Sequence, residues 1–182
     1  MADRFEPFDP DQLSAEARAV YDRILSERGY VPVPYQFWLA YTGFLDPIEP
    51  VEEFLRHGVS LEERLVEIVV LVVAKHWRAQ YVWTSHGPAA EKAGVDPAVV
   101  ETIRSRAVPD FAKNDELVCY TSVPHSSPGA RSKTISGRWC STSIGEDGVN
   151  EVLGLIGLYT SVCLTMVACK MLTKNGEPDP LT

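Results

Sequence analysis

Two residues, Glu67 and His86, combine types and spacing suited to proton transfer. Glu67 lies within the apolar run Leu65 to Ala74, where an unpaired charge would be costly to bury. It therefore needs a partner, for which His86 is the best candidate and Arg64 or Arg78 the structural alternatives. An imidazole exchanges a proton near neutral pH, and a carboxylate can orient it or serve as the acid itself. The pair is a candidate acid–base site.

The element that must carry Glu67 is predicted to be a long buried helix. The residues Ser60-Leu61-Glu62-Glu63 form a potential capping box in front of the apolar run Leu65 to Ala74. The β-branched residues of this run also suit a buried strand. The capping box and the lack of turn residues before Lys75 favour the helix.

The element that carries His86 is predicted to be a second helix, from about Ala79 to Ala93 with a stop at Gly94. On this helix positions 79, 82 and 86 are three and four residues apart and share one face. A continuous helix would hold Glu67 far from His86, so the chain must reverse near Trp77-Arg78 for the two to meet.

Capping residues mark further helices along the chain. Ser14 begins an amphipathic helix that ends at Gly29, Asp46-Pro47 is expected to begin another, and Asp96-Pro97 begins a helix over Ala98 to Arg104. Residues 121–143 are rich in Ser, Gly and Pro and are predicted to form a long loop.

The stretch Val152 to Cys169 has no charged residue and reaches the lower edge of a membrane-spanning length. Its Gly, Ser and Thr content and the lack of a flanking aromatic belt favour a helix buried on most sides of a globular core. We therefore expect no membrane association.

The start of the chain shows no basic segment followed by an apolar run, which predicts a cytoplasmic protein.

The composition narrows the kinds of protein and of binding partner that remain. A chain of 182 residues with 45% hydrophobic content fits one domain with a buried core. The net charge of −8, without a basic face, argues against nucleic acid as a partner. Four cysteines without a CxxC pair are expected to be reduced thiols. No nucleotide, phosphate or metal motif occurs, so no cofactor and no metal are expected.

The spacing of Glu67, Ala79, Val82 and His86 resembles the Glu-x11-Cys-x2-Cys-x3-His pattern of alkyl hydroperoxidase D, with both cysteine positions substituted. The surrounding sequence is similar to the cysteine-free, carboxymuconolactone decarboxylase-like branch of that superfamily. The segments that carry this likeness are residues 34–39, 63–68, 78–83, 93–95, 145–149 and 151–159. The likeness covers roughly residues 4–118 and 144–180.

The resemblance implies an all-α, AhpD-like bundle of about six to eight helices in a single domain, residues 1–182, with 121–143 as a divergent loop. The bundle is expected to form around the Leu65–Ala74 helix and the Val152–Met171 helix. Helices that are apolar on nearly every side, together with the resemblance, also predict a homo-oligomer built on dimers.

The resemblance further implies a cofactor-independent enzyme that transfers a proton on a small carboxylated, unsaturated lactone or a related cyclic compound. Decarboxylation, isomerisation and ring opening or cyclisation all remain open, because Val82 stands where decarboxylases of the family commonly carry a Glu. Ala79 and Val82 cannot replace the two thiols of the peroxidase, so thiol peroxidase activity is not expected.

The sequence leaves two other functions open. The first is a non-catalytic, oligomeric ligand-binding or scaffold protein that retained the fold. The second is a degenerate peroxidase that uses Cys119 or Cys163, although neither occupies a thiol position of the family.

Five further residues are secondary candidates for the wall of an organic acid or lactone site: Trp38, His76, Tyr81, Val82 and Trp83. Each has a structural alternative. His76 is equally suited to a surface position at a helix end, and large aromatic side chains mostly fill cores.

Overall fold

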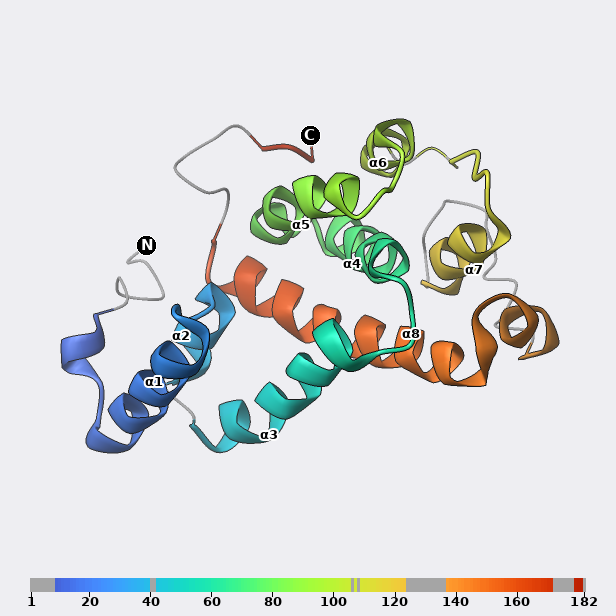
Figure 1. The fold of residues 1–182 in the computed structure, drawn as a ribbon. Coiled ribbons are helices and arrows are strands. Elements are labelled where there is room, and N and C mark those ends of the chain that lie inside the picture. Colours follow the sequence, from blue (N-terminus) through green and yellow to red (C-terminus); the bar gives the residue numbers. More distant parts are fainter. Residues whose placement is uncertain are drawn as a thin grey trace. The chain divides into compact units, whose positions relative to one another are not determined.

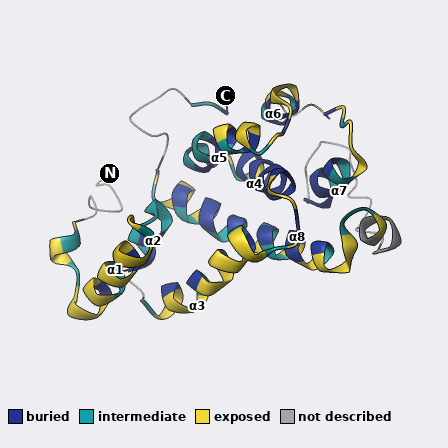
Figure 2. Ribbon diagram, in the orientation of Figure 1, coloured by how far each residue is buried: buried dark blue, intermediate teal, exposed yellow. Residues whose placement is uncertain are grey.

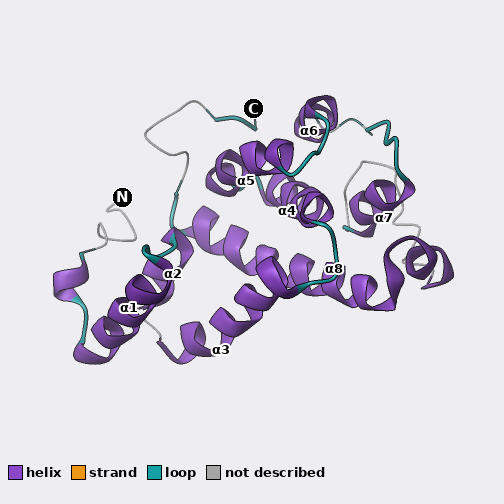
Figure 3. Ribbon diagram, in the orientation of Figure 1, coloured by secondary structure: helices purple, strands orange, loops and turns teal. Residues whose placement is uncertain are grey.

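The computed structural model describes residues 9–39, 42–105, 107, 109–123, 137–171 and 179–181, and the side chains of these residues except 137–141. Its regular secondary structure within these ranges is helical, with no strand (Figure 3). The all-α fold predicted from the sequence is confirmed, and the eight α-helices of the described ranges agree with the predicted six to eight. The chain divides into two compact units, residues 1–54 and 55–182, and each is described by itself. A single domain stays a prediction.

The first unit contains α1 (Ala15–Arg28), α2 (Val33–Trp38) and α3 (Thr42–Glu53), after a short 3-10 turn at Pro10–Gln12. The predicted ends of α1 are confirmed. The hydroxyl of Ser14 accepts a hydrogen bond from the Ala17 amide at 3.2 Å. Gly29 ends the helix with φ of 75°, in the left-handed region that favours glycine.

The helix expected to begin at Asp46-Pro47 instead begins at Thr42, so that Pro47 and Pro50 lie inside α3. A proline within a helix leaves the carbonyl four residues earlier without its donor. Those carbonyls belong to Gly43 and Asp46, which are both exposed. Solvent is therefore available to the carbonyls that the prolines leave unpaired.

The second unit is built around α4 (Glu63–Trp77). The helices α5 (Gln80–Lys92), α6 (Pro97–Arg104), α7 (Asn114–Ser122) and α8 (Gly137–Ala168) all pack against α4 (Figure 1). Every residue of α4 from Arg64 to Lys75 is buried, which makes α4 the core of this unit (Figure 2). The predicted central helix is confirmed.

The capping box predicted for α4 is wrong. Its N-cap is Glu62, without a side-chain capping bond. The donors of Ser60 are used elsewhere, because the buried carboxylate of Glu151 on α8 accepts hydrogen bonds from the Ser60 amide at 2.8 Å and from the Ser60 hydroxyl at 3.0 Å. The same carboxylate accepts from the Leu61 amide at 3.2 Å. A carboxylate from α8 thus accepts the bond from the Ser60 amide that the capping box had assigned to Glu63.

The chain reverses between α4 and α5 where the sequence predicts it. Arg78 adopts a left-handed conformation with φ of 54°, and the Ala79 amide bonds to the Ala74 carbonyl at 2.9 Å. The predicted start of α6 is also confirmed, because the Asp96 carboxylate accepts a hydrogen bond from the Ala98 amide at 2.8 Å.

The long loop predicted over residues 121–143 is wrong at both ends. Helix α7 continues to Ser122, and α8 begins at Gly137. Residues 124–136 lie outside the described residues. A break in α8 falls at Gly145, whose φ of 76° and ψ of 168° are available to glycine at little cost. The helix that follows this break carries the apolar stretch noted in the sequence.

Among the described helices one stretch, Thr142–Ala168 of α8, is long and apolar enough to cross a membrane by length and composition. This is weak evidence for a membrane, because a core helix has the same composition. The helix packs against α4, α5 and α7, and 44% of its most apolar window is buried. Leu153, Leu164 and Val167 are exposed, so α8 is less buried than the sequence predicts.

Candidate acid–base site

The structure brings Glu67 and His86 into direct contact. Glu67 lies in the middle of α4, and its side chain is completely buried. His86 lies on α5, with 18% of its side chain exposed. Its Nδ1 is 2.8 Å from Oε2 of Glu67, a hydrogen-bond distance. A fully buried carboxylate therefore binds an imidazole that is still partly exposed to solvent.

An arginine contacts the same carboxylate. Nη1 of Arg56 donates a hydrogen bond to Oε1 of Glu67 at 2.9 Å, and 16% of the Arg56 side chain is exposed. Arg56 lies in a π-helical turn, Phe54–Gly58, a rare geometry that is frequent at functional sites. The two oxygens of Glu67 thus serve two different partners, one on each side.

The arginines proposed from the sequence as alternative partners of Glu67 are engaged elsewhere. Arg64 pairs with Asp115 and Glu116 of α7, and Arg78 lies 3.7 Å from Asp179. Arg56 was not predicted. It lies in no periodic pattern with Glu67, and the only signal for it was the general need of a buried carboxylate for a positive charge.

The electrostatics of the site keep Glu67 ionised. Burial by itself would raise the pKa of Glu67, but the hydrogen bond from His86 and the charges of His86 and Arg56 outweigh it and lower the pKa below its usual value. An ionised carboxylate only accepts hydrogen bonds, so Nδ1 of His86 must carry the hydrogen. In neutral His86 the other nitrogen, Nε2, is then the basic one.

Tyr159 of α8 completes the surroundings of the imidazole. Its ring lies edge-on to the His86 ring, with centroids 5.2 Å apart and planes at 90°. Tyr159 is 5% exposed, so this contact restricts the imidazole from a helix far away in the sequence. Sequence reasoning missed it as a site residue, because nothing in the pattern of α8 distinguishes Tyr159 from a core aromatic.

The two positions that carry thiols in alkyl hydroperoxidase D are apolar and buried in this protein. Ala79 is 1% and Val82 is 3% exposed. Of the cysteines, Cys119 and Cys163 are buried, and burial raises the pKa of the Cys163 thiol to about 12. Burial also raises the pKa of Cys169. The side chain of Cys140 lies outside the described residues.

The secondary candidates divide between core and surface. Trp83 is buried on α5, next to Val82. Tyr81 is partly buried, which raises the pKa of its hydroxyl despite a hydrogen bond with Ser85. His76 is exposed at the end of α4, where its ring lies edge-on to Trp77.

Trp38 belongs to the first unit. There it is buried, with its ring 5.8 Å from Tyr35 and 5.3 Å from Phe44. These contacts fit the core-packing alternative for Trp38.

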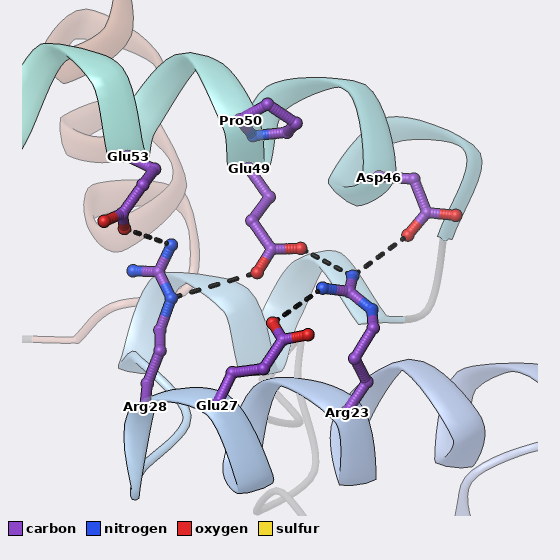
Figure 4. A pocket seen from close by; sticks show the side chains of 7 residues that line it. All are labelled: Arg23, Glu27, Arg28, Asp46, Glu49, Pro50 and Glu53. Atoms are coloured by element: carbon purple, nitrogen blue, oxygen red, sulfur yellow. Dashed lines mark hydrogen bonds and ion pairs between the residues drawn. The ribbon is translucent and has the colours of Figure 1, made fainter. Parts of the chain in front are cut away.

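A charged cavity of about 590 Å³ lies between α1 and α3 in the first unit (Figure 4). It is lined by Arg23, Glu27, Arg28, Asp46, Glu49, Pro50 and Glu53. The two arginines bridge the carboxylates, with the shortest distance, 2.6 Å, between Arg23 and Glu49. Every charged group drawn there has a partner of opposite sign. The side chains that line the cavity therefore form an ion-pair network that joins α1 to α3.

The geometry of the helices has a counterpart among solved structures. The chain is similar to an uncharacterized peroxidase-related protein from Silicibacter sp. TM1040, with a TM-score of 0.69 over 96% of this chain and 94% of that one. The two proteins share a fold. Their sequences are 15% identical, so the likeness shows the fold alone. No protein-family model and no curated protein matches the sequence.

The site offers no arrangement for a metal ion. Within the described part of the chain, no group of three or more His, Cys, Asp or Glu side chains is placed to hold one. What the site can do chemically is to move a proton through His86, supported by the charge of Glu67.

Proposed function

We propose that this protein is a cofactor-independent acid–base enzyme that transfers a proton on a small carboxylated, unsaturated lactone or a related cyclic compound. The observation that carries the proposal is the 2.8 Å hydrogen bond between Nδ1 of His86 and the buried carboxylate of Glu67. A carboxylate in this position fixes the tautomer of a histidine and stabilises its protonated form, as in other histidine bases oriented by an acid.

The proposed roles follow from this arrangement. In a decarboxylation, the bond between the ring carbon and the carboxylate breaks, carbon dioxide leaves, and the electron pair stays on the unsaturated system. Protonated His86 then gives the proton on Nε2 to carbon and recovers one from water. In an isomerisation, neutral His86 takes a proton from one carbon at Nε2 and returns it to another. Glu67 keeps its charge throughout and orients the ring.

The substrate class rests on the resemblance to the carboxymuconolactone decarboxylase-like branch, and the similarity to the peroxidase-related protein supports the all-α fold alone. Val82 and Trp83, four and three residues before His86 on α5, are buried apolar side chains on the same side of that helix, which places the imidazole beside an apolar interior. Val82 replaces the usual acid of the family decarboxylases, so isomerisation and ring opening or cyclisation are proposed beside decarboxylation.

We do not expect thiol peroxidase activity, although the structurally similar protein is called peroxidase-related. A peroxidatic thiol must ionise to attack a peroxide. Buried Cys163, whose pKa is raised to about 12, is a poor thiolate at neutral pH. The degenerate peroxidase that would use Cys119 or Cys163 is therefore the weakest of the candidate functions.

A non-catalytic, oligomeric ligand-binding or scaffold protein is the second candidate, and the bond between Arg56 and Glu67 favours it. A buried carboxylate with two cationic partners also meets the needs of a purely structural network. Self-association on dimers, a cytoplasmic location, and the absence of nucleic-acid, membrane and cofactor partners stay predictions under either function.

The test is turnover of carboxymuconolactone-type substrates by the wild type and by His86→Ala and Glu67→Gln. Loss of a positioned general acid or base typically costs about 10²- to 10⁴-fold in rate. The matched control is Glu49→Gln, which removes a buried carboxylate of the other unit and should leave turnover unchanged. Unchanged turnover in both site variants would remove the site assignment. A wild type that binds such acids without converting them would support the second candidate.

A further inference from the structure

Glu67 has two basic partners, of which one always carries a positive charge. Its two oxygens are bound by Arg56 from the π-helical turn and by His86 from α5. These two side chains are the charged groups whose interactions lower the pKa of Glu67. Tyr159 of α8, whose ring lies edge-on to the imidazole, adds an aromatic contact and no charge of its own at neutral pH. Among the described residues, the charged groups that contact the Glu67 carboxylate are thus one guanidinium and one imidazole.

The two partners of Glu67 differ in how they hold their protons. A guanidinium stays protonated at any pH a protein tolerates, whereas an imidazole gains or loses its proton near neutrality. If His86 were the sole partner of a fully buried carboxylate, a proton would have to remain on the pair to avoid an uncompensated charge in the interior. The pair would then hold that proton too tightly for rapid exchange.

We propose that Arg56 is a positioning residue that supplies the permanent counter-charge of Glu67, and so frees His86 to gain and lose a proton during the reaction. This inference rests on the proposed function for its catalytic meaning. Arg56 compensates Glu67 whether or not His86 is protonated. It also lies close to the imidazole, since both bind the same carboxylate, and like charges repel. Both effects weaken the hold of the site on the proton of His86.

The experiment is an NMR titration of the His86 ring in the wild type, Arg56→Gln and Arg56→Lys. The measured quantity is the pH at which the Glu67–His86 pair loses its shared proton, which belongs to the pair as a whole. We expect Arg56→Gln to raise this pH by about one unit or more, which corresponds to at least a tenfold gain in proton affinity. Arg56→Lys retains the charge and should stay within about 0.3 unit of the wild type.

The matched control is Arg23→Gln, which removes the arginine paired with Glu49 in the first unit and should leave the titration of His86 unchanged. A titration in Arg56→Gln within about 0.2 unit of the wild type would overturn the inference. So would an equal shift in Arg56→Lys, because geometry and not charge would then be responsible. If Arg56→Gln does not fold, Arg56→Met, which also removes the charge while keeping an unbranched side chain, takes its place and should raise the titration in the same way.

The titration needs no turnover, which separates this inference from the proposed function. In an active enzyme, Arg56→Gln should move the limb of the pH–rate profile that reports loss of the proton to higher pH by the same amount. A shifted titration in a protein that turns over no substrate would support the role of Arg56 in proton affinity and would count against the enzymatic function.

Discussion

Glu49 in residues 1–54 and Glu67 in residues 55–182 are both buried carboxylates that bind an arginine. Glu49 faces Arg23 and Arg28, two side chains whose charge never changes. Glu67 faces one arginine and one histidine, and only the histidine can exchange a proton. The comparison teaches that burying an acid among arginines gives a fixed tie between helices, whereas replacing one arginine by an imidazole gives a group that can do chemistry.

The two carboxylates also differ in their contact with solvent. Arg23 has 42% of its side chain exposed, so the pair with Glu49 lies at the edge of solvent. Arg56 has 16% exposed and Glu67 none. Charges that water does not screen interact more strongly, and removing the partner of such a charge lowers the free energy of unfolding by more. We therefore expect every perturbation of the Glu67 site to have the larger effect.

The largest expected effect is on stability. Glu67→Gln removes the buried carboxylate that Arg56 and His86 share, and breaking a buried pair in this way typically costs about 3–5 kcal/mol of unfolding free energy. Glu49→Gln should cost about 1 kcal/mol, since Arg23 is largely hydrated and Arg28 keeps Glu52 and Glu53. Urea unfolding of both variants measures the difference, and equal losses would break the comparison.

Acid should weaken the Glu67 site in a predictable direction. The pKa of Glu67 is lower in the folded protein than in the unfolded chain, so its contribution to stability is present above the usual carboxyl range. That contribution is lost as the pH falls through the lowered value. The unfolding free energy should fall more steeply with acid in the wild type than in Glu67→Gln, as measured by unfolding across acidic pH. Parallel curves would contradict the lowered pKa.

A third buried carboxylate, Glu151, sharpens the comparison because its hydrogen bonds come from neutral donors of Ser60 and Leu61. Ser60→Ala removes one of the three hydrogen bonds and leaves the two amides in place. The expected loss is about 1 kcal/mol, the usual value of a single hydrogen bond, measured by thermal or urea unfolding. A loss as large as that of Glu67→Gln would show that the charge of the partners is not what separates the sites.

Salt should produce the smallest effect. Double-mutant cycles of Arg23 with Glu49 and of Arg56 with Glu67 give the two coupling energies. In 1 M NaCl the first should fall by a few tenths of a kcal/mol, because screening acts on exposed charges, while the second should change less in proportion. A coupling between Arg56 and Glu67 that salt abolishes would place that pair in solvent.

Much of the site could be predicted from the sequence because its two main residues obey local rules. Glu67 stood in an apolar run and required a partner, and the reversal near Trp77-Arg78 brought His86 within reach. Signals of the same local kind also predicted the caps at Ser14 and Asp96.

The features that sequence reasoning missed depend on packing between distant elements. Arg56 and Tyr159 reach the site from a π-helical turn and from α8, and no spacing rule connects them to Glu67. Arg64 lies three residues from Glu67 on α4, yet it binds α7. The amide and the hydroxyl of Ser60 bind Glu151 instead of forming the predicted capping box. A carboxylate that the fold brings close can accept hydrogen bonds from several donors at once.

The most direct test of the account is the tautomer of neutral His86, read from the ¹⁵N chemical shifts of its ring nitrogens. The bond to ionised Glu67 predicts a hydrogen on Nδ1 and an unprotonated Nε2, and Glu67→Gln should weaken this preference while Glu49→Gln leaves it unchanged. A hydrogen on Nε2 in the wild type would contradict the account, because His86 would then have no basic nitrogen to offer a substrate.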